Sequence, residues 1–246
     1  MQVASLMAGV GSRLGGLTAD RHKAMLRING RSILEHQLAT FKQTGLTNAT
    51  FVLGHGAEEI THSLFKNLPD VCFTIKYNAE FTRRNLDWSA YLALSSCEGP
   101  VFYYEGDLLV PPSLLLQLSA SASDVCLAVD SRIPSSRADT LLTVSGGKPE
   151  HLIFCEHGVA SGHDAANAAG ELICLLKLSE RARRTLVELL EQQSFVGDMQ
   201  LYRLVERTFS TLATDFIDVG NRPWVEVDNI HDLRRAEALI PAILSG

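Results

Sequence analysis

The cations Arg13 and Lys23 are the first residues of the chain that suit phosphate chemistry. Arg13 stands in a glycine-rich loop that follows the apolar run Val3 to Met7, which reads as a buried strand. A strand that opens into such a loop exposes backbone N–H groups, and a nearby cation adds charge, so the pattern is typical of a phosphate site. The glycines of this loop are Gly9, Gly11, Gly15 and Gly16.

Two familiar phosphate-binding motifs do not fit the loop. The dinucleotide fingerprint G-x-G-x-x-G requires a glycine where the chain has Leu14. A P-loop that begins at Gly11 reaches Gly16, but it continues with Leu17 and Thr18 instead of Lys and Ser or Thr. A flexible turn after a core strand stays open as an alternative, because an isolated glycine-rich loop is a weak signal.

Carboxylates at the ends of two later strand-like runs complete the reactive set. Asp107 ends the hydrophobic run 101–107, where α/β sheets place their ligands. Asp228 follows the strand-like residues 223–227, and Glu226 should point to the same face. Two carboxylates, two cations and a glycine-rich loop suit a Mg²⁺–nucleotide site, because Mg²⁺ binds one or two carboxylates plus phosphate oxygens and water. For Asp228, a carboxylate at the start of the last helix is the simpler alternative.

The elements that must position these residues predict an α/β fold. After the loop, Ser32 and Glu35 form a capping box that begins a helix. Strand-like runs at 49–53 and 71–77 enclose an amphipathic helix at 57–68. This order predicts a three-layer, Rossmann-like α/β/α fold with a mixed, mostly parallel sheet between helical layers.

The second half of the chain continues the pattern with one interruption. Residues 140–144 and 151–156 flank Ser-Gly-Gly-Lys and predict a hairpin. Because no repeat or linker is found, we expect a single domain over residues 1–246, with a lid or insertion at about 131–170. The other expected elements are helices at about 85–96, 179–193 and 198–209, strands at 124–130, 171–178 and 214–219, and a last helix capped by Asn229.

Composition argues against several classes of protein. The net charge is −6 and no basic block stands out, which argues against a nucleic-acid partner. The five cysteines form no C-x-x-C pair and are odd in number, which favours a reducing, cytoplasmic location over a disulfide framework. The first residues are unlike a secretory signal, and no apolar run approaches the ~20 residues of a membrane span, so we expect no membrane partner.

Taken together, the motifs resemble the signature of the nucleotidyltransferases that act on sugar 1-phosphates and phosphocholine. Residues 7–14, Met-Ala-Gly-Val-Gly-Ser-Arg-Leu, with Lys23 are similar to L-A-A-G-x-G-[ST]-R-[LM] followed by P-K-P-L. The Glu-Gly-Asp strand and the W-x-E-[IV]-D pattern at 224–228 more closely resemble the cytidylyltransferases of phosphocholine and phosphonates. His22 and Ala24 replace the two prolines of this pattern, so we expect a less rigid loop that keeps the lysine. The similarity extends over residues 30–35, 85–92, 105–107, 170–171 and 224–229, and so spans almost the whole chain.

This resemblance implies a fold of the nucleotide-diphospho-sugar transferase type and specific residue roles. Backbone N–H groups of residues 8–12 would hold a triphosphate, and Arg13 would bind its β- and γ-phosphates. Lys23 would contact the α-phosphate region and the attacking substrate, and Mg²⁺ would bind Asp107 and Asp228, with Glu226 as a further candidate. The expected nucleotide-binding residues are Met7, Ala8, Gly9, Val10, Gly11, Ser12 and Arg13, and the expected catalytic residues are Arg13 and Lys23.

The reaction implied by the resemblance is transfer of CMP from CTP to a small phosphonate or phosphocholine-like acceptor, with release of pyrophosphate. A sugar-1-phosphate nucleotidyltransferase that uses UTP, dTTP or GTP is an alternative. A molybdopterin-type guanylyltransferase is a weaker alternative, because the W-x-E-V-D stretch is not part of the sequence pattern of those enzymes. A non-catalytic regulatory module on the same fold is a further alternative. The sequence leaves the oligomeric state open, with a homodimer as one option.

The acceptor site is harder to assign from sequence. Asn85 and Ser89 are i,i+4 neighbours on one predicted helix face and match a family position near substrate, and Glu171 lies on a predicted strand. Aromatic rings with a carboxylate could cage a quaternary ammonium group, although core packing is an equal alternative for them. The aromatic candidates are Trp88, Tyr91, Tyr103 and Tyr104. The histidines His151, His157 and His163 match no standard zinc spacing and predict a polar lid loop.

Overall fold

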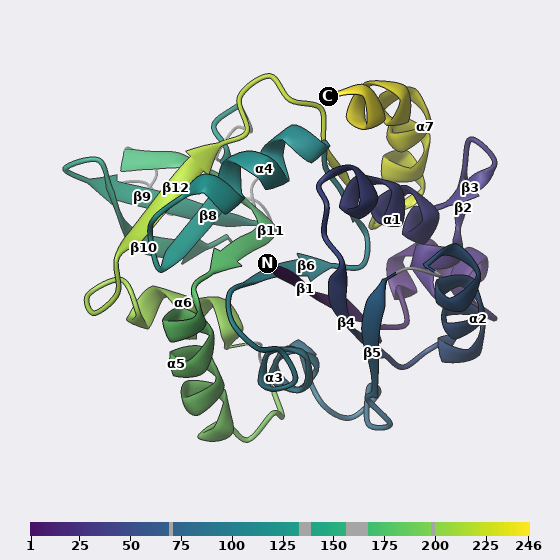
Figure 1. Cartoon of the computed structure of the whole chain (residues 1–246), viewed down its shortest axis with the longest axis horizontal. Helices are drawn as coiled ribbons and strands as arrows, with labels where there is room; N and C mark the ends of the chain where they lie inside the picture. The colour runs from purple at the N-terminus through teal and green to yellow at the C-terminus, as the bar shows by residue number, and fades with distance from the viewer. Residues whose placement is uncertain (69–70, 133–138, 156–166, 198–199) are drawn as a thin grey trace.

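A mixed, nine-stranded sheet forms the centre of the computed structural model, which describes residues 1–68, 71–132, 139–155, 167–197 and 200–246 (Figure 1). Its strands are β1 (Gln2–Met7), β4 (Asn48–Leu53), β5 (Cys72–Tyr77), β6 (Val101–Glu105), β8 (Val125–Asp130), β9 (Thr140–Ser145), β10 (Lys148–Phe154), β11 (Ala168–Leu178) and β12 (Thr214–Asp218). Strands β6, β1, β4 and β5 run parallel, and β11 is antiparallel to β6, β8 and β9. Strand β12 is parallel to β8, and β9 and β10 form the predicted hairpin.

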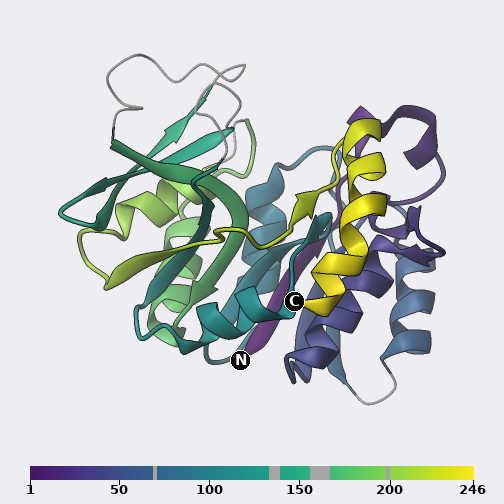
Figure 2. The ribbon, with the colours of Figure 1, turned by 90° about the horizontal axis from the view of Figure 1, so that it is seen from above.

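Helices cover both faces of this sheet, which confirms the predicted three-layer α/β/α class. One face packs against α3 (Leu86–Ser95), α5 (Glu180–Glu191) and α6 (Leu201–Arg207) through residues such as Leu94 and Leu186. The other face packs against α1 (Ile33–Gln43), α2 (Ala57–Asn67) and α4 (Pro112–Ala120) through residues such as Leu38 and Leu64. Figure 2 shows the hairpin β9–β10 and the last helix, α7 (Ile230–Ser245), towards opposite ends of the molecule.

Local signals in the sequence set the starts of two helices that border the site. Helix α1 begins at the predicted capping box, in which Glu35 N donates to Ser32 Oγ (3.1 Å) and Ser32 N donates to Glu35 Oε2 (2.7 Å). Helix α7 begins after Asn229, whose Oδ1 accepts a hydrogen bond from His231 N at 2.8 Å. These caps satisfy N–H groups that the first helical turn leaves without partners.

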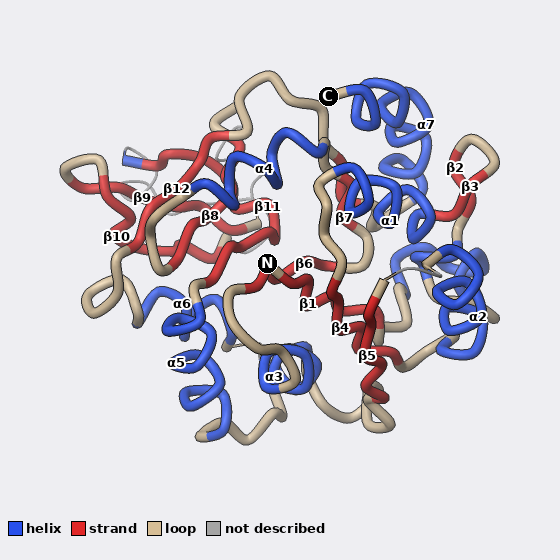
Figure 3. The backbone as a smooth tube through the Cα atoms, in the orientation of Figure 1, coloured by secondary structure: helices blue, strands red, loops and turns tan. Residues whose placement is uncertain are grey.

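Two short pairings add to the predicted elements, and one of them contains β13 (Val225–Glu226) from the predicted strand-like run 223–227. Strand β7 (Leu108–Leu109) pairs antiparallel with β13 (Val225–Glu226), and Figure 3 shows β7 next to α1. The same approach lets Val227 N donate to the Asp107 carbonyl at 3.1 Å. Strands β2 (Arg27–Ile28) and β3 (Arg31–Ser32) form an antiparallel hairpin just before α1. The β7–β13 pairing brings the C-terminal motif to the end of β6.

The region predicted as a lid is described only in part. Residues 133–138 and 156–166, which include His157 and His163, lie outside the described residues, so the lid and the single-domain boundary at 1–246 stay predictions. His151 is on β10, and its Nδ1 lies 2.9 Å from Glu206 Oε1. Among the described residues, no helix combines the length and apolar character that a membrane crossing needs.

Candidate active site

The glycine-rich loop lies at the carboxyl end of β1, whose side chains from Val3 to Met7 are buried. After Gly11, which has a φ of 65°, the chain forms a 3-10 helix over Ser12–Thr18. The Thr18 hydroxyl donates to the Gly11 carbonyl at 3.0 Å, so the loop closes on itself. Leu14 is buried in a core that it shares with α7. This burial explains why leucine stands where the dinucleotide fingerprint requires glycine.

Close backbone contacts fix the base of the loop against β6. Gly106 N donates to the Leu6 carbonyl at 3.0 Å. A Cβ at position 106 would lie 2.6 Å from that carbonyl oxygen and 2.7 Å from Met7 Cγ, so the Glu-Gly-Asp sequence needs its glycine. Met7 is fully buried, and its contact with a nucleotide stays a prediction. Through these contacts, the loop and Asp107 occupy adjacent strand ends.

Lys23 begins a short 3-10 turn, Lys23–Met25, that His22 caps. The His22 Nδ1 accepts a hydrogen bond from Ala24 N at 3.0 Å, and the ring is 1% exposed. Burial, together with the nearby charges of Lys23 and His55, lowers the pKa of His22 to about 3, so its imidazole is neutral at pH 7. The loop that was expected to be less rigid is therefore held by a neutral, buried histidine.

The cations Arg13 and Lys23 form ion pairs with Asp107 and Asp228. Lys23 Nζ contacts Asp107 Oδ2 and lies 3.1 Å from Asp228 Oδ1, and Arg13 Nη2 lies 2.8 Å from the same Asp228 oxygen. Asp107 is 2% exposed, and its Oδ1 has no hydrogen-bond partner in the described part of the chain. Asp107, Glu226 and Asp228 each offer an oxygen within 4.8 Å of the others. Hard oxygen ligands and an unpartnered buried carboxylate oxygen fit a Mg²⁺ ion.

A further carboxylate, Glu105, adjoins Glu226 and was missed by sequence reasoning. Its Oε1 accepts hydrogen bonds from Tyr202 Oη (2.9 Å) and Tyr103 Oη (3.1 Å). Burial raises the pKa of Glu105, although the Tyr202 hydroxyl and Lys23 oppose that rise. Burial and then the charge of Glu105 raise the pKa of Glu226 to about 8. Glu105 belongs to the Glu-Gly-Asp motif, which was a usable signal, whereas nothing in the sequence pointed to Tyr202.

Comparison with known proteins identifies the family of this chain. A family model described as the MobA-like NTP transferase domain matches residues 4–207. The chain belongs to this MobA-like NTP transferase family. A CMP-5′-(3-aminopropyl)phosphonate synthase from Streptomyces rubellomurinus is 25% identical over 235 residues, which make up 94% of this chain and 37% of that protein.

A second relative is a 2-aminoethylphosphonate cytidylyltransferase from Lancefieldella rimae. It is 27% identical over 119 residues, which make up 48% of this chain and 47% of that protein. The chain therefore matches less than half the length of either curated relative. A CTP:phosphocholine cytidylyltransferase structure from Streptococcus pneumoniae has the same fold, with a TM-score of 0.74, 17% identity and coverage of 97% of this chain and 98% of that chain. These relatives confirm the predicted resemblance to cytidylyltransferases.

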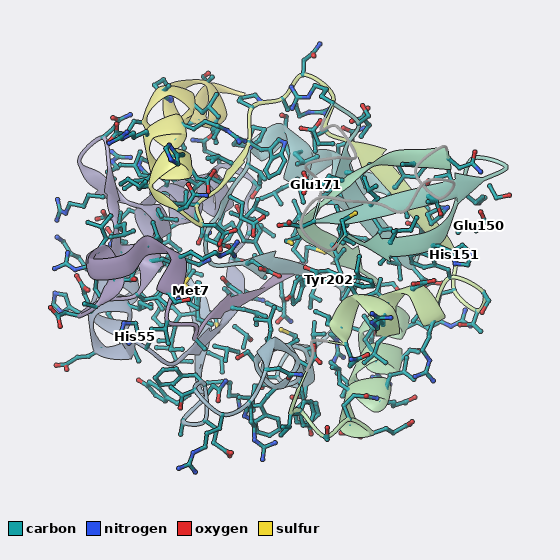
Figure 4. The ribbon with its side chains drawn as sticks, turned by 180° about the vertical axis from the view of Figure 1, so that it is seen from behind. Met7, His55, Glu150, His151, Glu171 and Tyr202 are labelled. Atoms are coloured by element: carbon teal, nitrogen blue, oxygen red, sulfur yellow. The ribbon has the colours of Figure 1, made fainter. Side chains whose placement is uncertain are left out.

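The predicted acceptor residues have partners inside the protein. Asn85 is the N-cap residue of α3, and the buried Ser89 accepts a hydrogen bond from Asn78 Nδ2 at 2.9 Å. Glu171 accepts a backbone N–H bond at 2.9 Å, and burial raises the pKa of its carboxyl group. Figure 4 shows Glu171 on the side that carries the hairpin, whereas Met7 lies on the other side. Contact of Asn85, Ser89 and Glu171 with an acceptor stays a prediction.

The predicted aromatic residues divide into core residues and a self-contained cluster. Tyr103 and Tyr104 are fully buried strand residues. Trp88 is stacked on Tyr91, with ring centroids 5.4 Å apart, and the Arg84 guanidinium lies 4.5 Å from the Trp88 ring. The face of Trp88 thus already carries a cation from this chain, which favours the packing alternative for these rings.

Trp224, the first residue of the W-x-E-V-D stretch, anchors the C-terminal motif. Its Nε1–H donates to Asp130 Oδ2 at 2.7 Å, and Arg132 pairs with the same carboxylate at 2.7 Å. Burial alone would raise the pKa of Asp130, but hydrogen bonds from Arg132 and Trp224 bring it below its ordinary value. Sequence reasoning missed Asp130, although it ends a buried strand as Asp107 does. The anchor fixes the segment that carries Glu226 and Asp228.

Proposed function

We propose that this protein is a Mg²⁺-dependent cytidylyltransferase that transfers CMP from CTP to a small phosphonate or phosphocholine-like acceptor. The observation that carries this proposal is the contact among Arg13, Lys23, Asp107 and Asp228, which come from distant parts of the chain. Two cations beside two carboxylates, next to a glycine-rich loop, suit a triphosphate with its metal ion. A non-catalytic module would have no need of all four groups.

The chemistry follows from positioning and charge. An acceptor oxygen attacks the α-phosphorus of CTP and forms a new P–O bond, while the bond to the bridging oxygen breaks and its electron pair leaves with pyrophosphate. Backbone N–H groups of residues 8–12 bind the triphosphate, and the exposed side chain of Arg13 reaches its β- and γ-phosphates. Lys23 neutralises charge near the α-phosphate. No protein base is needed, because the acceptor oxygen is ionised near neutral pH.

The carboxylates supply the metal ligands in this proposal. Asp107 and Asp228, with Glu226 beside them, would hold Mg²⁺, and the unpartnered Oδ1 of Asp107 supports this assignment. When bound, the ion would neutralise charge on the α-phosphate. In the present structure, Lys23 bridges Asp107 and Asp228, so the lysine supplies the positive charge between them.

The relatives support the choice of nucleotide and acceptor. One relative is named a synthase of CMP-5′-(3-aminopropyl)phosphonate, and another is named a cytidylyltransferase of 2-aminoethylphosphonate. We infer that this protein uses CTP and an acceptor of the same class. We keep Asn85, Ser89 and Glu171 as proposed acceptor contacts, because of where they lie in the sequence. A homodimer and a cytoplasmic location also remain proposals.

Pyrophosphate release tests the proposal. We would measure it with each of the four NTPs against 2-aminoethylphosphonate, phosphocholine and hexose 1-phosphates. The control variant is Glu188→Gln, a substitution at an exposed residue that has no proposed role in the site. We expect release with CTP and a phosphonate or phosphocholine. Preference for UTP and a hexose 1-phosphate would refute the cytidylyl assignment and support the sugar-phosphate alternative. Absence of release with every pair would refute the enzymatic proposal and support the regulatory alternative.

A further inference from the structure

The carboxylates at this site form two groups that share Glu226. The first is the proposed metal set of Asp107, Glu226 and Asp228, and the second contains Glu105, Cys174 and Glu226. Ligand atoms within each group lie within 4.8 Å of one another. A group bound at Glu105 would therefore sit beside the proposed metal set.

The second group is built into the protein. The two tyrosine hydroxyls that donate to Glu105 Oε1 come from β6 and from α6, and Tyr103 and Tyr202 are both buried. This leaves the other Glu105 oxygen for a further donor. Among the described residues, the Glu226 carboxylate has no hydrogen-bond partner. Two carboxyl groups this close destabilise each other's ionised form unless a cation or a donor lies between them.

Asp107, in the adjoining group that shares Glu226, provides a second observation. Its Oδ1 is buried and lacks a hydrogen-bond partner within the described part of the chain, and it belongs to the group that shares Glu226. A buried polar atom without a partner is costly, so this end of β6 is shaped for bound groups. Among the described residues, Arg13 and Lys23 pair with Asp228 and Asp107, and no ion pair involves Glu105 or Glu226.

Trp88 and Tyr103, two of the predicted aromatic candidates, do not offer the alternative form of cation recognition. A quaternary ammonium group is bound through the faces of aromatic rings, because it has no N–H group to donate. Arg84 already lies over Trp88, and Tyr103 is fully buried with its hydroxyl committed to Glu105. Carboxylates without a contacting cation suit a primary ammonium group instead, since it donates three hydrogen bonds.

We propose that Glu105 and Glu226 bind the primary ammonium group of the acceptor, so that the enzyme selects an aminoalkylphosphonate over phosphocholine. The inference rests on the proposed function and names the substrate class of the same site. The phosphonate lies beside Asp107 and Lys23, and its carbon chain extends toward Glu105. Tyr202 is a positioning residue, because it acts by holding the Glu105 carboxylate.

The test compares an acceptor that has a primary ammonium group with one that lacks the nitrogen and with a phosphate ester that carries a quaternary ammonium group. We would measure kcat and KM for pyrophosphate release from CTP with 2-aminoethylphosphonate, ethylphosphonate and phosphocholine. The variants are Glu105→Gln and Tyr202→Phe, and the exposed Glu188→Gln is the matched control. We expect the protein to prefer 2-aminoethylphosphonate at least about tenfold over both other acceptors, since hydrogen bonds between charged groups are worth that factor. Glu105→Gln should reduce the preference over ethylphosphonate about tenfold, mainly through KM, and Tyr202→Phe should reduce it less.

Three results would overturn the inference. Equal use of phosphocholine or ethylphosphonate would show that no primary ammonium subsite exists. A Glu105→Gln variant with the same preference as the control would exclude Glu105. A variant that changes the Mg²⁺ concentration for half-maximal rate, but not the acceptor preference, would make the second group a cation site. Absence of release with every acceptor would instead refute the proposed function, and the inference with it.

Discussion

Replacement of His22 by Asn tests the buried cap that supports Lys23. Asn keeps a side-chain oxygen that accepts a hydrogen bond from Ala24 N, but it does not titrate. In the native protein, His22 is 1% exposed, and burial with the adjacent charges lowers its pKa from 6.5 to about 3. The substitution therefore removes a titration while it preserves the cap.

The direction of the effect follows from proton binding. In the unfolded chain, His22 takes up a proton below about pH 6.5, whereas the folded protein does not until about pH 3. The unfolded state binds more protons between these values, so the free energy of unfolding falls as the pH is lowered through this window. At pH 4.5, which is two units below the unfolded pKa, the loss due to His22 is about 2.7 kcal/mol.

Urea unfolding at pH 7.5 and pH 4.5 measures this loss. We expect the native protein to lose about 2.7 kcal/mol more free energy of unfolding between the two pH values than His22→Asn does. His62→Asn is the matched control, because His62 is exposed on α2. An equal loss in His22→Asn and the native protein would show that His22 is already charged in the folded state, and the account of the cap would be wrong.

Three further predictions concern the site and its anchor. Asp107→Asn should reduce turnover about a hundredfold or more with an unchanged melting temperature; a near-normal rate would refute its metal role. Lys23→Ala should reduce kcat by a similar factor while the rate still requires Mg²⁺, and full activity would show that another cation acts, which neutral His22 does not supply. Trp224→Phe should reduce the free energy of unfolding in urea by about 1.5–3 kcal/mol, because Asp130 loses a charge-assisted hydrogen bond; a change below about 0.5 kcal/mol would refute the anchor.

Local signals made the N-terminal half of the fold predictable. The Ser32–Glu35 capping box and the apolar face of α1 are written within one short stretch, and the structure has both. The carboxyl ends of parallel strands meet at one edge, which is why Asp107 and the glycine-rich loop could be placed together from sequence. Periodicity and caps act over a few residues, so they need no knowledge of tertiary contacts.

The contacts that complete the site depend on tertiary structure, which local sequence signals do not report. Strands β7 and β13 have two residues each, so they carry no periodicity, yet their pairing brings Glu226 toward Asp107. Tyr202 reaches Glu105 from α6 only because the sheet and helices have packed. The packing of Trp88 beneath Arg84 likewise depends on tertiary structure, and it favours a packed cluster over an aromatic cage. Side-chain partners across the fold were therefore the unpredictable part.

The two residues that replace the prolines of the family signature depend on each other. Proline at position 24 would have no N–H group, whereas Ala24 has one and is fully buried, so it needs an acceptor. His22 supplies that acceptor through Nδ1, which proline at position 22 could not do. His22 and Ala24 thus lack the fixed φ angles of two prolines, but they form one buried hydrogen bond next to Lys23, which is kept. The departure from the signature alters how Lys23 is held, and leaves intact the contacts that Lys23 makes with Asp107 and Asp228.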